Sequence, residues 1–250
     1  MTVTTPTTTG TTTGTTTDAI ATALQGAGYC FVHGEAMRPL VEHATTLVDW
    51  DAFAASWDDL ELDTYMADGG RYRRRRHGLY GAGSRAVTRR PDGPHYQALD
   101  YNSLNGGVER WFAPITPAIG DSPSMMAILA WCTAMFGSLA PATREWWIEA
   151  HQFRIEARPG VVGNPTPEGA HRDGVDFVLV LLVRRVNIAC GVTSVYSPTG
   201  AELGTFTLTA PFDAALVDDH RVWHGVTAVE PIVPDAYAHR DVLVVTFRAQ

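Results

Sequence analysis

The stretch His171-Arg-Asp-Gly-Val-Asp-Phe-Val-Leu-Val-Leu-Leu-Val-Arg-Arg-Val186 sets a polar triplet just before a long apolar run. Every residue from Phe177 to Val183 is apolar, which is typical of a buried strand. Residues i and i+2 of an extended segment point the same way, so His171 and Asp173 can chelate one ion together. The stretch therefore predicts a strand with a candidate metal pair at its mouth.

From Trp146 onward the sequence consists of short apolar runs and period-two patterns, punctuated by Gly, Pro, Asn and Asp. These patterns predict strands at Glu149–Ala157, Val175–Val186, Thr193–Ser197, Gly204–Thr209, Ala214–Val217, Trp223–Val229 and Asp241–Phe247. Several short strands after a helical first half indicate an α+β chain whose C-terminal part is a β-sandwich or barrel.

The first half opens on a Thr-rich, low-complexity segment that has almost nothing to bury. We expect residues 1–17 to be a disordered tail and residues 18–250 to form a single domain. Helices are predicted at Ala19–Gln25 with Asp18 as the N-cap, at Met37–Val48, and at Met125–Leu139 after Ser122-Pro-Ser, with a strand at Tyr29–Val32.

Composition excludes several classes of protein. The 250 residues carry a formal net charge of −8, which argues against a general nucleic-acid binder because phosphate affinity comes mainly from clustered Lys and Arg. No apolar stretch approaches the roughly 20 residues of a membrane helix, and the N-terminus lacks the pattern of a secretory signal. Three cysteines without a CxxC pair suit reduced thiols, so we expect a cytoplasmic location.

One segment departs from this acidic balance. Arg71-Tyr-Arg-Arg-Arg-Arg76 places five arginines in six positions and looks extended. It can bind phosphate, pair with carboxylates elsewhere, or serve an anionic small molecule. Taken alone, a solvated or salt-bridged strand is the favoured interpretation.

The His-x-acid pattern occurs three times, so context must choose among the copies. His33-Gly-Glu35 lies near a helix start, and His239-Arg-Asp241 opens the last strand, whereas His171-Arg-Asp173 lies at the mouth of the β-structure. A third ligand is expected from a distant strand, where His224 is preferred to His220 in the preceding turn. Two histidines and one carboxylate leave half of the Fe(II) coordination sphere open, which favours oxygenase chemistry.

Four segments of the C-terminal half carry a specific resemblance: His151-Gln-Phe-Arg154, His171-Arg-Asp-Gly174, Trp223-His-Gly-Val-Thr227 and His239-Arg-Asp-Val-Leu-Val-Val-Thr-Phe247. They resemble the 2-oxoglutarate-dependent Fe(II) dioxygenases, and within them the small bacterial family that includes L-isoleucine 4-hydroxylase. Weaker similarity extends upstream through Gly70, Arg73 and Arg75 to Tyr101-Asn-Ser-Leu-Asn105. The resemblance implies an α+β fold with a double-stranded β-helix (jelly-roll, cupin-like) core and N-terminal helices packed against it.

The same resemblance implies a ligand set. Fe(II) would be bound by His171, Asp173 and His224, with 2-oxoglutarate and O2 as cosubstrates. Arg240, which opens the last strand, is assigned to the distal carboxylate of 2-oxoglutarate, because a guanidinium offers that group two parallel hydrogen bonds. Arg248, on the same strand parity, is the rival.

The implied activity is hydroxylation of an unactivated C–H bond of a free L-amino acid or close derivative, with release of succinate and CO2. Related halogenases lack the carboxylate ligand, so the presence of Asp173 favours hydroxylation. Arg73, Arg75 and Arg154 stand at matching positions and are candidates for the substrate carboxylate, although Arg154 can equally be structural, paired with Glu149 or Glu156.

Two alternatives stay open from the sequence alone. One is a cupin-like metal-binding or hydrolytic protein without oxygenase activity, and the other is a non-catalytic binding module that uses the arginine cluster as its interaction surface. The expected partner is a small-molecule amino acid, with no nucleic acid and no membrane, and a homodimer is left open.

Overall fold

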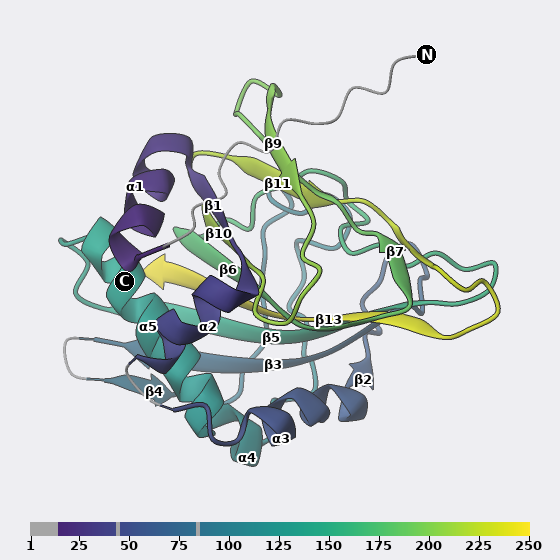
Figure 1. Cartoon of the computed structure of the whole chain (residues 1–250), viewed down its shortest axis with the longest axis horizontal. Helices are drawn as coiled ribbons and strands as arrows, with labels where there is room; N and C mark the ends of the chain where they lie inside the picture. The colour runs from purple at the N-terminus through teal and green to yellow at the C-terminus, as the bar shows by residue number, and fades with distance from the viewer. Residues whose placement is uncertain (1–14, 44–45, 84–85) are drawn as a thin grey trace.

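The computed structural model describes residues 15–43, 46–83 and 86–250 of the chain (Figure 1). Most of the predicted disordered tail, residues 1–14, lies outside the described residues. The predicted Asp18 N-cap was wrong, because helix α1 spans Thr17–Ala27 and the Thr16 hydroxyl accepts the capping hydrogen bond from the backbone N–H of Ala19 at 3.2 Å. Threonine satisfies a free helical N–H nearly as well as aspartate does.

An eight-stranded sheet forms the centre of the structure, in the order β1-β10-β6-β13-β5-β3-β2, with β4 paired to β3. Every neighbouring pair in it is antiparallel. The strands are β1 (Tyr29–Val32), β2 (Glu61–Leu62), β3 (Arg73–Ala82), β4 (Val87–Arg89), β5 (Trp146–Ala157), β6 (Phe177–Val186), β10 (Ala214–Asp218) and β13 (Ala238–Ala249).

Two smaller antiparallel sheets accompany the large one, and the three-stranded sheet lines the pocket described below. They are β11 (Trp223–Val226), β8 (Thr193–Tyr196) and β9 (Glu202–Phe206), and the pair β12 (Val229–Pro231) with β7 (Ile188–Cys190). This antiparallel core with a few helices confirms the predicted α+β jelly-roll fold. The predicted strand Tyr29–Val32 is present with the predicted bounds, and the other predicted strands are present with shifted ends, except that Trp223–Val229 divides into β11 and β12.

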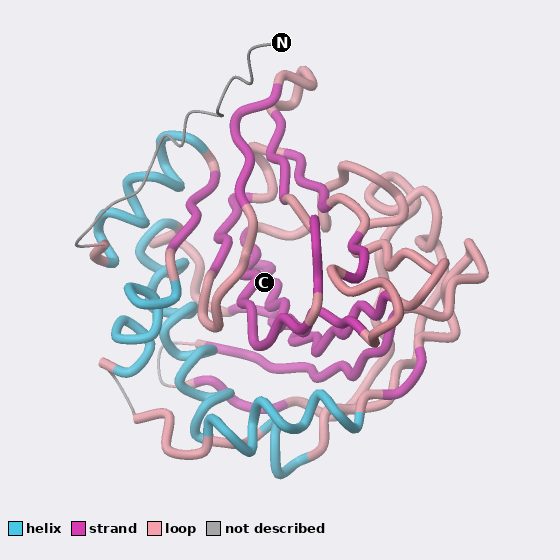
Figure 2. Tube along the Cα trace, turned by 45° about the vertical axis from the view of Figure 1, so that its right-hand side comes forward, coloured by secondary structure: helices cyan, strands magenta, loops and turns pink. Residues whose placement is uncertain are grey.

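Helices cover one face of the large sheet (Figure 2). They are α1, α2 (Gly34–Glu42), α3 (Trp50–Ala55) with the 3-10 turn η1 (Ser56–Asp59), α4 (Pro117–Gly120) and α5 (Pro123–Leu139). The prediction of one helix over Met37–Val48 was wrong. The helix starts earlier because the Gly34 N–H donates to Asp213 Oδ1 at 2.8 Å, a partner that lies far away in the sequence.

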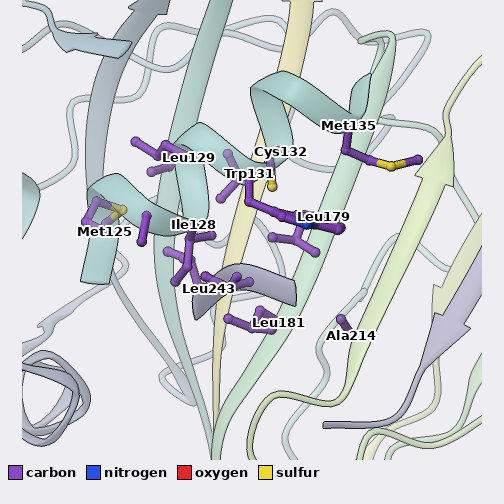
Figure 3. Packing of buried hydrophobic residues seen from close by; sticks show 14 of the residues in the cluster. Met125, Ile128, Leu129, Trp131, Cys132, Met135, Leu179, Leu181, Ala214 and Leu243 are labelled. Atoms are coloured by element: carbon purple, nitrogen blue, oxygen red, sulfur yellow. The ribbon is translucent and has the colours of Figure 1, made fainter. Parts of the chain in front are cut away.

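Helix α5 is the centre of the hydrophobic core. It begins at Pro123, slightly before the predicted start at Met125, with the Ser122 hydroxyl accepting a hydrogen bond from the Met125 N–H at 3.3 Å. Its buried side chains, Ile128 among them, pack on Leu181 of β6 and Leu243 of β13 (Figure 3). Within the described residues, no helix is long and apolar enough to cross a bilayer.

Strand alternation gives the two faces of the large sheet different tasks. Leu179 and Leu181 of β6 face the helices, whereas Val178 and Val180 line the pocket on the other face. The helices thus stabilise the back of the sheet and leave its front free to hold a site.

Candidate metal centre and ligand pocket

The predicted metal pair and its third partner meet in the pocket. An isolated antiparallel bridge joins His171 to His224 through two backbone hydrogen bonds of 2.9 Å, and the two ring centroids are 4.7 Å apart. Asp173 reaches both imidazoles: its Oδ1 is 3.7 Å from His171 Nε2, and its Oδ2 is 3.6 Å from His224 Nε2. One ligand atom from each residue lies within 4.8 Å of the others, so the three can close on one ion.

The protonation of these residues suits a cation. Burial by itself would lower the pKa of His171, but the nearby carboxylate of Asp173 raises it to about 9. Burial would raise the pKa of Asp173, yet the nearby imidazole of His171 lowers it to about 2. Burial and the His171 charge lower the pKa of His224 to about 4. The site therefore offers an ionised carboxylate and a neutral imidazole, and a divalent ion would replace the His171 proton.

Asp219 positions the loop that presents Asp173, and the sequence analysis missed it. Its carboxylate accepts backbone hydrogen bonds from Asp173 at 2.9 Å, Gly174 at 2.8 Å and Val175 at 3.2 Å. Gly174 has φ +79°, and a Cβ there would lie 2.6 Å from the Tyr101 ring. Glycine is needed at this position because the backbone turns sharply under an aromatic ring.

The rival ligands lie elsewhere. His220 is exposed and pairs with Asp176 at 2.9 Å, and His33 precedes helix α2 at its N-cap position. Asp241 is fully buried and is bound by Arg154 and Arg184. Among the described residues, only the His171 copy of the triplet shares a potential metal-binding cluster with a further histidine.

Arg240 lies in the pocket wall without an acceptor. It is 2% exposed, and its Nε and Nη2 have no hydrogen-bond partner among the described residues. Burial, and then the nearby charge of Arg185, lower its pKa to about 10. A buried guanidinium without a counter-charge fits an anionic ligand. Its rival Arg248 also borders the pocket but is solvent-exposed.

The arginine-rich strand divides by parity. Arg74 and Arg76 face away from the pocket and pair with Glu156 at 2.6 Å and Glu61 at 3.3 Å. Arg73 and Arg75 line the pocket. The predicted salt-bridged strand is therefore confirmed for the face with Arg74 and Arg76, and the predicted role toward an anionic small molecule stays a prediction for the pocket face.

The pocket-facing arginines form a charged group with Arg110, which the sequence analysis missed. Arg73 Nε binds Asp63 Oδ2 at 2.8 Å. The Arg75 Cζ lies 3.6 Å and 4.3 Å from the ring centroids of Phe112 and Phe153. Burial and the Arg73 charge lower the pKa of both Arg75 and Arg110, and each keeps an Nε without a partner among the described residues.

A histidine cluster beside this group also went unpredicted. Glu149 Oε2 accepts hydrogen bonds from His77 Nε2 at 2.9 Å and His95 Nδ1 at 2.6 Å, and Oε1 accepts one from Trp147 Nε1 at 3.2 Å. Burial would raise the pKa of Glu149, but these imidazole donors hold it well below its usual range. Burial lowers the pKa of His95 to about 4.

The histidine cluster has the side chains of a second metal site but the wrong surroundings for one. Arg75 Nη2 donates to His151 Nδ1 at 2.7 Å, so the ring proton of His151 lies on Nε2. Neither ring nitrogen of His151 then has a free lone pair for a metal. The Arg75 charge beside Glu149 would also repel a cation. The contacts indicate a polar pocket wall, in which Glu149 is held by hydrogen bonds.

Arg154 does not lie at the pocket, so its assignment to the substrate is corrected. On β5 the odd residues face the pocket, and Arg154 faces the opposite side. Its Nε binds Asp241 Oδ1 at 2.7 Å and its Nη2 binds Asp58 Oδ1 at 2.7 Å. Burial would lower its pKa, but Asp241 and Asp58 raise it. Its role is structural, with partners other than the expected Glu149 or Glu156.

Two histidines and one carboxylate on an antiparallel β core, beside a pocket with a buried unpaired arginine, define the class of non-haem Fe(II) oxygenases that use 2-oxoglutarate. The chain belongs to the 2OG-Fe dioxygenase family, whose sequence model matches residues 54–246. Enzymes of this family use Fe(II), 2-oxoglutarate and O2. The donor set and the unpaired Arg240 both fit these groups.

Solved structures support the same fold. A bsmA homologue from Methylobium petroleophilum PM1 is 38% identical with a TM-score of 0.85, over 93% of each chain. IDO from Bacillus thuringiensis is 17% identical with a TM-score of 0.77, over 96% of this chain and 98% of its own. The Fe(II)/α-ketoglutarate-dependent dioxygenase TqaL is 19% identical with a TM-score of 0.74, over 93% and 86%. The last two likenesses show the fold alone, and no curated protein gives a significant match.

Proposed function

We propose that this dioxygenase hydroxylates an unactivated C–H bond of a free L-amino acid, as the resemblance to the bacterial L-isoleucine 4-hydroxylase family suggests. His171, Asp173 and His224 would hold Fe(II), and Arg240 would bind the distal carboxylate of 2-oxoglutarate. The observation that carries the proposal is the convergence of these three ligand atoms on a pocket whose wall contains a buried, unpaired arginine. When bound, iron with 2-oxoglutarate and O2 supplies the oxidising power, with release of succinate and CO2.

The chain's own residues supply binding, orientation and exclusion of water. The His171–His224 bridge and the Asp219 hydrogen bonds hold the three ligands in place without a metal. Gly169 O lies 3.1 Å from His171 Nδ1 and orients that ring. Near Arg240 the pocket is lined by apolar side chains, including Val180, Leu208 and Val242, which keep water from the reacting centre.

The amino-acid part of the proposal depends on the arginine group. A free amino acid needs a cation for its carboxylate, and Arg73 and Arg75 line the same pocket as the metal triad. Arg110 adds a third charge and an N–H without an acceptor among the described residues. We add Arg110 to the substrate-binding set and remove Arg154 from it.

The proposal extends to the setting of the enzyme. We propose a single domain over residues 18–250. The expected partner is a small amino acid, without nucleic acid or membrane, in the cytoplasm. The net charge of −8 and the unpaired cysteines support this setting, and a homodimer stays an option.

A mass-spectrometric screen tests the proposal. The protein with Fe(II), 2-oxoglutarate and air is offered each L-amino acid, and we expect one or more products of +16 mass together with stoichiometric succinate. His171→Ala and Asp173→Ala should abolish both signals, whereas the control His220→Ala, at an exposed histidine, should keep them. Amino-acid-independent succinate formation alone, or full activity in Asp173→Ala, would refute the proposal.

A further inference from the structure

Glu168 is a buried carboxylate in the pocket, and among the described residues only one of its two oxygens has a hydrogen-bond partner. Its side chain is 8% exposed and lines the pocket three residues before His171. Oε1 lies 3.5 Å from Asn102 Nδ2, whereas Oε2 is buried and has no hydrogen-bond partner among the described residues. An acceptor left in this state costs stability unless a ligand donates to it.

Orienting the metal ligand does not account for Glu168. Its Oε1 lies 3.7 Å from His171 Nδ1, but that nitrogen is already hydrogen-bonded to Gly169 O at 3.1 Å. The backbone carbonyl therefore orients the imidazole. The Glu168 charge remains free for another donor.

The groups around Glu168 specify that donor. The Nε atoms of Arg75 and Arg110 are donors without acceptors among the described residues, and both arginines line the same pocket as Glu168. The Glu168 charge partly opposes the lowering of the Arg110 pKa by burial and by Arg73. The pocket thus presents unused donors and an unused anionic acceptor near each other. A ligand that carries both a carboxylate and an ammonium satisfies both sets.

The other pocket carboxylate is a poorer receptor for a cation. Glu149 accepts hydrogen bonds from His77, His95 and Trp147, so most of its lone pairs are used. Glu168 has no such set of donors. The two carboxylates therefore have different roles: Glu149 is part of the pocket wall, and Glu168 can accept hydrogen bonds from a bound cation.

We infer that Glu168 binds the α-ammonium group of the substrate, while Arg75 and Arg110 bind its carboxylate. The inference rests on the proposed function and sharpens it, because the site then takes amino acids with a free primary amine and rejects N-acylated, peptide-linked and desamino analogues. A neutral amide or a missing amine would leave the Glu168 carboxylate buried and unpaired.

Binding calorimetry on the anaerobic Fe(II)·2-oxoglutarate protein tests the inference. The probes are the free L-amino acids, their N-acetyl derivatives and the matching carboxylic acids without the amine. We expect wild type to bind its best amino acid at least about 100-fold more tightly than either analogue. Glu168→Gln should lose about 30- to 100-fold for the amino acid and keep its affinity for the desamino acid within about 3-fold.

Controls separate this role from a merely structural one. Glu61→Gln, at a side chain that is 63% exposed, should behave as wild type, and Glu168→Asp should recover part of the lost affinity. Retained desamino-acid binding in Glu168→Gln shows that the pocket is folded. Equal amino-acid affinity in wild type and Glu168→Gln, or no amino-acid binding by wild type, overturns the inference.

The outcomes also distinguish this inference from the proposed reaction. A protein that binds amino acids through Glu168 and never forms a +16 product would contradict the reaction and leave the receptor assignment standing. A +16 product formed by Glu168→Gln with an unchanged KM for the amino acid would contradict the receptor assignment alone.

Discussion

Two groups of buried arginines lie on opposite faces of the same sheet and meet opposite surroundings. Arg154 pairs across the β5–β13 ladder with Asp241, and one residue further on Ile155 pairs with Arg240. Arg154 donates to two carboxylates, and its pKa is raised. Arg240 has N–H groups without a partner in the part of the chain that the structure describes, and burial lowers its pKa. A buried arginine whose donors are used holds the fold together, and one whose donors are unused awaits a ligand.

Breaking the closed network should give the largest effect. Arg154→Met leaves Asp241, which is fully buried, with Arg184 and the His239 imidazole at 3.6 Å as its remaining basic neighbours among the described residues. Removing one partner of a buried ion pair is strongly destabilising, and with Arg184 still in place we expect a loss of about 3 kcal/mol in the free energy of unfolding. That corresponds to a fall of about 6–12 °C in Tm, measured by calorimetry.

The same variant should leave ligand binding alone. The affinity of the folded Arg154→Met protein for 2-oxoglutarate should match wild type, because Arg154 lies outside the pocket. A large loss of 2-oxoglutarate affinity without a loss of Tm would show that the two groups of arginines had been assigned the wrong roles.

Arg240→Met should give the reverse pattern. We expect about a 100-fold loss in 2-oxoglutarate affinity, measured by titration of the anaerobic Fe(II) protein, since a charge pair inside the pocket is lost. The Tm of the ligand-free protein should stay the same or rise, because a buried charge without a partner is removed. Arg248→Met is the matched control on the same strand and should change the affinity less than about 3-fold, and a drop in Tm comparable to that of Arg154→Met would contradict the comparison.

A smaller effect should appear in the pH dependence of stability. His95 is neutral when folded, with a pKa of about 4 against about 6.5 unfolded, so the unfolded state binds more protons as the pH falls between these values. The contribution of His95 to the free energy of unfolding is fully present above about pH 6.5 and is lost as the pH falls towards 4. At pH 5.5 the loss is about 1 kcal/mol.

Substitution of His95 tests whether this residue causes the loss of stability in acid. Denaturant unfolding at pH 7.5 and 5.5 should show a smaller acid loss in His95→Asn than in wild type. Glu61→Gln, at a carboxylate whose side chain is 63% exposed, should keep the wild-type slope over this range. An unchanged slope in His95→Asn would place the titrating group elsewhere.

Much of the fold was predictable from local pattern. The apolar run after His171 forms β6, and Ser122-Pro-Ser opens α5, because burial periodicity and N-caps are local properties. The predicted ends of helices were wrong where a residue far away in the sequence fixes the end of the helix. The start of α2 depends on the Asp213 carboxylate, which no window around Gly34 contains.

The site residues were predicted only where a local pattern or the family resemblance marks them. His171 and Asp173 share a face because strands alternate, and strand position together with the family resemblance pointed to His224 and Arg240. No signal near Arg110 or Glu168 marks them as pocket residues, because loops bring them there. Asp219 lies between Asp218 and His220 in the sequence, but its role follows only from the hydrogen bonds that its carboxylate accepts from the loop at Asp173.

Composition, periodicity and side-chain chemistry, all contained in the sequence, fix the β-rich class of fold, the acidic balance and the choice of residues able to bind a metal. Which buried charges have partners is a property of the folded chain. That property depends on contacts between strands and loops far apart in the chain, such as Arg154 with Asp58 and Asp241. It separates Arg154 from Arg240, two arginines that the sequence had placed together among the ligand-binding candidates.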